Sequence, residues 1–174
     1  NGAGSALVAE VGRLLASVEG HLDTRVRLVT FGSEEIGLWG AYHAAETTPK
    51  EEIACVVNLD GACSSRNLRV GTNGFDWMAS VFQWAFVQEG IPAVMASTTS
   101  DRSGRGWGHT HADTLDKLDS RDLREVATLV AAAVYRFATG EVAADHRSRE
   151  SIRDAIDEGY VEELKTGGRW PYEE

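Results

Sequence analysis

Apolar residues follow two different periods along the 174-residue chain, and these periods predict helices interleaved with strands. A period of three to four residues predicts helices at 5–18, from near 38, and at 75–88, 121–138 and 148–165. Short runs of mainly apolar, β-branched residues predict strands at 25–31, 53–59, 67–71 and 93–96. Because helices and strands alternate, the sequence predicts an α/β fold with a mostly parallel sheet.

The length of the chain is typical of a single domain. We expect residues 1–140 to form the main domain, whose last helix is capped by Ser120 and ends at Gly140. Residues 141–174 are expected to form a charged helix and a tail that pack on the same domain.

Charge and composition argue against some classes of partner and favour one compartment. The formal net charge of −10 argues against nucleic acid and against an anionic membrane surface as partners. The sequence contains neither an apolar run that approaches a membrane span nor a recognisable signal peptide. A cytoplasmic location is therefore favoured.

The most informative motif is a pair of adjacent carboxylates, Glu34 and Glu35, in a turn bracketed by Gly32 and Gly37 directly after a predicted strand. Neighbouring carboxylates repel each other unless a positive charge lies beside them. A metal ion is the usual solution, with one carboxylate as ligand and the other as a base. The alternative at this point is a solvated acidic turn.

Two further segments favour the metal. Asp60 directly follows the predicted strand at 53–59, and the segment 109–119 is rich in His and Asp. Glu, Asp and His are the ligands of hydrolytic zinc sites. Because strand ends in an open α/β sheet meet at one edge, we expect Glu34, Glu35, Asp60 and His109 to converge there.

Four segments resemble, in order, motifs of the M28 family of zinc-dependent exopeptidases: Asn1-Gly2-Ala3-Gly4-Ser5, Gly32-Ser33-Glu34-Glu35-Ile36-Gly37-Leu38, Asn58-Leu59-Asp60 and His109-Thr110-His111-Ala112-Asp113-Thr114. Each motif is weak alone, but four in order at plausible spacing are specific. The resemblance covers about residues 1–139 and implies that 1–140 is a catalytic domain. It also implies a three-layer fold with the sheet between helices.

The resemblance implies a role for each matched residue. Glu34 resembles the general base, Glu35 and His109 resemble ligands of one zinc, and Asp60 resembles a ligand of a second zinc. The two metals of the family share a hydroxide that attacks the scissile carbonyl, and the base passes its proton to the leaving amine. The substrate implied is a peptide cut at one terminal bond, with an aminopeptidase favoured over a carboxypeptidase.

The family's remaining ligands, a His and a bridging Asp, would precede Asn1, so we expect the chain to lack its N-terminal part. The chain alone should then bind zinc weakly or not at all, although an intact site takes two zinc ions. Exposed sheet edge should favour self-association into a homo-oligomer.

Several alternatives stay open from the sequence. His111 could replace His109 as a ligand, and Asp113 could orient the His109 ring through its other nitrogen. The same Glu34, Glu35 and His109 would also serve a glutaminyl-cyclase-like acyltransferase that uses one zinc. A third alternative is a peptidase-like fold used as a non-catalytic binding module.

Overall fold

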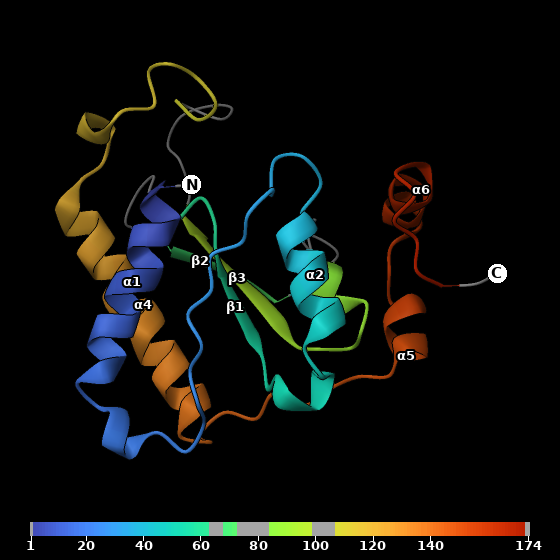
Figure 1. Ribbon diagram of the computed structural model, residues 1–174, viewed down its shortest axis with the longest axis horizontal. Coiled ribbons are helices and arrows are strands. Elements are labelled where there is room, and N and C mark those ends of the chain that lie inside the picture. Colours follow the sequence, from blue (N-terminus) through green and yellow to red (C-terminus); the bar gives the residue numbers. More distant parts are fainter. Residues whose placement is uncertain (1, 63–67, 73–83, 99–106, 173–174) are drawn as a thin grey trace. The chain divides into compact units, whose positions relative to one another are not determined.

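The computed structural model describes residues 2–62, 68–72, 84–98 and 107–172 (Figure 1). The chain divides into two compact units, each of which is described by itself. Unit 1 comprises Asn1–Thr30, Leu59–Val70 and Ala96–Ala143, and unit 2 comprises Phe31–Asn58, Gly71–Met95 and Ala144–Glu174. The division at residue 140 expected from the sequence stays a prediction.

The elements follow the predicted order except at residues 25–31 and 148–165 (Figure 1). The helices are α1 (Gly2–Ala16), α2 (Trp39–Thr47), α3 (Trp84–Val87), α4 (Ser120–Ala138), α5 (Arg149–Arg153) and α6 (Glu158–Thr166). The strands are β1 (Val56–Leu59), β2 (Leu68–Thr72) and β3 (Ala93–Thr98). Of the helix predicted at 75–88, the part before Trp84 lies outside the described residues.

The described strands form one sheet in the order β1-β3-β2. Val56 N–H donates to Pro92 O at 2.9 Å, and Thr98 N–H donates to Gly61 O at 3.0 Å. These bonds join the two segments in the same chain direction, so β1 and β3 run parallel. The α/β class is confirmed, but the described sheet is small and mixed rather than mostly parallel.

The strand predicted at 25–31 is wrong for the described structure. The segment pairs with no strand among the described residues, and most of it is exposed, including Leu28 and Val29. Alternating β-branched residues predict an extended backbone, but a strand also needs a partner that the pattern does not specify. Asp23 and Thr24 instead donate their N–H groups to Ala138 O at the end of α4.

In unit 1, α1 and α4 lie side by side (Figure 1). Both helices bury the apolar stripe that their periodicity predicts, because residues three and four apart share one helix face. The buried side chains are Leu7, Val11 and Leu15 on α1 and Val126, Ala127, Val130, Ala131 and Ala138 on α4.

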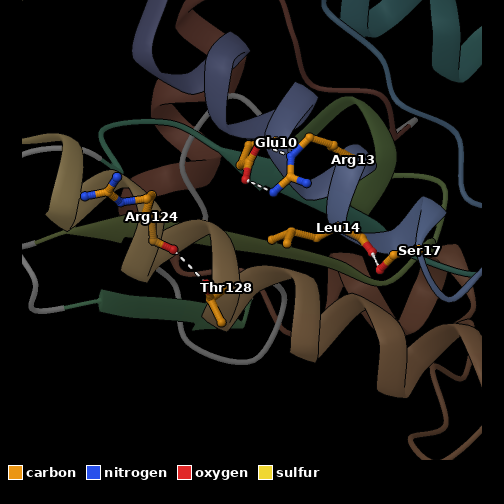
Figure 2. Close-up of polar contacts among 6 residues, drawn as sticks. All are labelled: Glu10, Arg13, Leu14, Ser17, Arg124 and Thr128. Carbon is orange, nitrogen blue, oxygen red and sulfur yellow. Dashed lines mark hydrogen bonds and ion pairs between the residues drawn. The ribbon is translucent and has the colours of Figure 1, made fainter.

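Polar contacts on these helices are local, as Figure 2 shows. Arg13 Nη2 lies 2.7 Å from Glu10 Oε1, Ser17 Oγ donates to Leu14 O at 2.6 Å, and Thr128 Oγ1 donates to Arg124 O at 2.8 Å.

The N-cap of α4 is Asp119 rather than Ser120. Its Oδ1 accepts from the Arg121 N–H at 2.7 Å, and Ser120 is the first residue of the helix. Both residue types cap helices well, and two adjacent candidates leave a one-residue ambiguity. Gly140 follows the helix with φ 72°, as expected of a glycine beyond a helix end.

Unit 2 is built around an aromatic core. Trp84, Val87 and Ala93 are buried together with Ile152 and Leu164 from the C-terminal segment 144–174. Partly buried hydrophobic residues pack against this cluster, and they are Tyr42, Val56, Ile156, Tyr160, Trp170 and Tyr172.

The single helix predicted at 148–165 is wrong. The segment forms α5 and α6, because Asp157 leaves the helical backbone region and caps a second helix by accepting from the Gly159 N–H at 2.9 Å. Ser148 caps α5 in the same way, accepting from the Ser151 N–H at 3.1 Å.

Candidate active site

The turn that carries Glu34 and Glu35 is fixed by backbone hydrogen bonds. Glu34 O accepts from Gly37 N–H at 3.1 Å and from Leu38 N–H at 3.0 Å. Ser33 lies in the left-handed region with φ 59°, which a residue with a Cβ adopts at a cost of about 1 kcal/mol. Such strain is common at functional turns. Glu34 is half-buried and Glu35 is exposed, so the two carboxylates have different surroundings.

The start of α2 holds this turn in place. Leu38, buried and also left-handed at φ 61°, is the residue before the helix. Gly40 N–H donates to Gly32 O at 3.1 Å, and a Cβ on Gly40 would lie 2.6 Å from that oxygen. The contact needs a glycine at position 40, so packing explains this residue just beyond the Gly32–Leu38 motif.

Asp60 follows β1 directly, at the carboxyl end of the strand. Gly61, the next residue, accepts from both the backbone N–H and the Oγ1 of Thr98, each at 3.0 Å. These bonds tie the chain just after Asp60 to the end of the parallel strand β3. Asp60 is half-buried.

His109 lies in a turn stabilised by its neighbours. Thr110 donates to Trp107 O through both its N–H, at 3.2 Å, and its Oγ1, at 2.6 Å. The φ of His109 is 62°, a third left-handed non-glycine residue at a predicted motif. His109, His111 and Asp113 are all exposed.

A group of hydrogen-bonded side chains, Thr114, Asp116 and Lys117, follows the His109 turn. Asp116 accepts from Lys117 and, at 2.5 Å, from Thr114 Oγ1. The Lys117 and Thr114 hydrogen bonds lower the pKa of the Asp116 carboxyl group. The Lys117 ammonium also lies 5.4 Å from the centroid of the Trp107 ring. The ionised Asp116 therefore already has partners on its own segment.

The four predicted residues fall in both units. Glu34 and Glu35 belong to unit 2, whereas Asp60 and His109 belong to unit 1. Within either unit, the described residues include no group of three or more His, Cys, Asp and Glu side chains that could hold a metal. Convergence of the four residues stays a prediction.

Sequence reasoning missed one residue beside the carboxylate turn. Arg169 comes from the C-terminal segment, and its Nη2 lies 3.7 Å from the position that a Cβ on Gly37 would occupy. The two residues are far apart in the chain, and no motif connects them. Only the packing of the C-terminal segment on unit 2 could reveal the proximity.

Comparison with known proteins adds family information. Residues 1–79 match the family model of peptidase family M28. The aminopeptidase YwaD of Bacillus subtilis (strain 168) is 25% identical over 167 residues, an alignment that covers 78% of this chain and 36% of the relative. The chain thus spans about a third of the length of this curated relative. No solved structure gives a significant match.

The matched family model and the matched relative are both described as peptidases. The resemblance of the chain to peptidase family M28 is thereby confirmed, and the matched segment contains Glu34, Glu35 and Asp60. His109 lies beyond residue 79, so its role rests on its motif alone.

Among the described residues, none of the helices is both long and apolar enough to cross a membrane.

Proposed function

We propose that the protein is a zinc-dependent exopeptidase that releases the N-terminal residue of a peptide. The observation that carries this proposal is the family match over residues 1–79, which encloses three of the four predicted site residues. The aminopeptidase relative supports the choice of the N-terminal over the C-terminal bond. We also propose that the complete domain has the three-layer fold of these enzymes.

The donor set fits zinc. We propose that Glu35 and His109 would hold one zinc and Asp60 a second, because carboxylate oxygen and imidazole nitrogen are ordinary zinc ligands. Zinc in such sites acts as a Lewis acid and lowers the pKa of water. All three proposed ligands are exposed or half-buried in their units, which leaves them accessible to an ion.

Glu34 is the proposed general base. Its carboxylate takes a proton from the attacking water and delivers it to the amine that leaves. A base in this role cannot also be tied up as a metal ligand, which accounts for two consecutive Glu with separate tasks. The different burial of Glu34 and Glu35 supports this division.

The test is hydrolysis by the complete gene product supplied with zinc. Leucine 4-nitroanilide should be cleaved, its N-acetyl form should not, and chelation by EDTA should stop turnover. A Gln-initiated peptide included in the assay should yield free Gln. Formation of pyroglutamate instead would identify a cyclase, and failure to turn over any of the substrates would favour a binding module.

A further inference from the structure

Unit 2 contains three side chains whose hydrogen-bond donors have no acceptor among its described residues. The hydroxyl oxygens of Tyr42 and Tyr160 are buried and have no hydrogen-bond partner in the part of the chain that the structure describes. The guanidinium of Arg169 makes no ion pair or hydrogen bond with the described residues. Buried polar groups in native proteins are nearly always satisfied, so each orphan calls for an explanation.

The core of unit 2 holds these donors in one place. Trp84 Nε1–H donates to Arg169 O at 3.4 Å, which fixes the backbone of Arg169 against the buried indole. The Tyr160 ring meets the same indole edge-on, with centroids 5.8 Å apart. Tyr42, on α2, packs against the same cluster. The Arg169 side chain extends to the turn at Gly37.

The electrostatics keep the two phenols protonated. Burial first, and then Glu163 and the Tyr42 hydroxyl, raise the pKa of Tyr160 to about 12 against the opposing charge of Arg169. Burial also raises the pKa of Tyr42, again opposed by Arg169. At neutral pH both hydroxyls can therefore donate, and both lie within the field of a guanidinium that has no counter-ion among the described residues.

We propose that Arg169, Tyr42 and Tyr160 form a binding site for a carboxylate group, beside the turn that carries Glu34 and Glu35. A carboxylate has two acceptor oxygens and the charge that the guanidinium lacks, so it satisfies all three donors. Arg169 is only partly buried and offers the side of entry from solvent.

The position of the site suggests which carboxylate it takes. If the Glu34–Glu35 turn is part of the peptidase site, this carboxylate belongs to the substrate, either as the free C-terminus of a short peptide or as an acidic side chain. This link to the substrate rests on the proposed function. Carboxylate binding by the three residues does not.

Binding is tested on the metal-free 174-residue chain with N-acetylglycine, followed through the indole N–H signal of Trp84 by NMR. We expect a saturable shift with N-acetylglycine and none with N-acetylglycinamide, which has the same shape without the charge. Arg169→Gln should weaken binding about tenfold or more, as expected for a charge-assisted bidentate pair. Arg153→Gln, an exposed arginine of the same unit that pairs with Asp154, should leave it unchanged.

Phenol variants test the two hydroxyls separately from folding. Tyr42→Phe and Tyr160→Phe should each weaken N-acetylglycine binding by about threefold to tenfold. Without ligand, neither variant should lower the midpoint of urea unfolding, because each removes a hydroxyl that has no partner. No binding by the wild-type chain, or equal binding by Arg169→Gln, would mean that water satisfies these donors and would overturn the proposal.

Two peptide arms distinguish the sources of the carboxylate in the complete gene product. Leu-Gly against Leu-Gly-amide reports on a free C-terminus, and Leu-Asp-amide against Leu-Asn-amide reports on an acidic side chain. Arg169→Gln should raise the KM of one charged peptide, either Leu-Gly or Leu-Asp-amide. The KM of the matching uncharged peptide should not change. An equal KM change for charged and uncharged partners would contradict the substrate link. Absence of all hydrolysis would contradict the proposed function and leave the binding result standing.

Discussion

The two compact units are stabilised by different kinds of contact. In unit 1, the helix pair α1 and α4 buries aliphatic residues at regular spacing, and its polar contacts in Figure 2 join residues three or four apart. In unit 2, polar contacts join distant segments: His146 Nε2 donates to Ile53 O at 2.7 Å, and Tyr172 donates to Gln88 O at 3.2 Å. Periodicity therefore predicts the buried faces of α1 and α4 in unit 1, whereas the packing of the C-terminal segment in unit 2 depends on contacts between distant residues.

The same difference applies to the predicted site. Unit 2 supplies the proposed base and a ligand on a turn that α2 and the Gly32–Gly40 contact hold. Unit 1 supplies Asp60 at a strand end and His109 on an exposed turn. Four experiments test the proposed roles and contacts in the two units.

The largest effect is expected at Glu34. In the complete gene product, Glu34→Gln should lower kcat by about a hundredfold to ten-thousandfold, because a general base contributes that much to a rate. Zinc content, measured by elemental analysis, should stay nearly unchanged. A variant that loses zinc but hydrolyses normally once zinc is restored would make Glu34 a ligand and not the base.

The next effect concerns how the C-terminal segment is held in unit 2. Gly90 has φ 79°, and a Cβ there would lie 1.8 Å from Arg147 O, so Gly90→Ala should destabilise the protein by about 3 kcal/mol through strain and overpacking. Gly140 in unit 1 is the matched control, with φ 72° and open space around its Cβ position. Gly140→Ala should cost only about 1 kcal/mol of backbone strain. Urea unfolding measures the free energy of unfolding of both variants. Equal losses in the two variants would show that the Gly90–Arg147 contact adds nothing to the cost of the substitution.

The smallest effect tests the helix cap in unit 1. Asp119→Ala should lower the free energy of unfolding by about 1 kcal/mol, because the Arg121 N–H loses its acceptor. Ser120→Ala should change it by less than about 0.5 kcal/mol, as expected of a surface residue without a special contact. A larger loss of unfolding free energy for Ser120→Ala than for Asp119→Ala would identify Ser120 as the cap.

The sequence predicts local structure well where neighbours along the chain decide it. The apolar stripes of α1 and α4 and the glycine beyond α4 are local signals, and all three are confirmed. Trp84 and Phe86, within the helix predicted at 75–88, are both buried. The missing pairing of 25–31 and the position of Arg169 depend on partners far along the chain, which a periodic pattern cannot specify. The break at Asp157 has a local cause, the cap that Asp157 makes to the Gly159 N–H, and the apolar period does not show it.

The central claim is that Glu35 from unit 2 and His109 from unit 1 bind the same zinc. Zinc stoichiometry of the complete gene product tests it most directly, by titration of the wild type and of Glu35→Gln, His109→Ala and the double variant. We predict about two zinc ions per chain in the wild type and about one in each of the three variants. His111→Ala is the control and should retain both. A double variant that binds no zinc, when each single variant binds one, would place Glu35 and His109 on different metals and contradict the account.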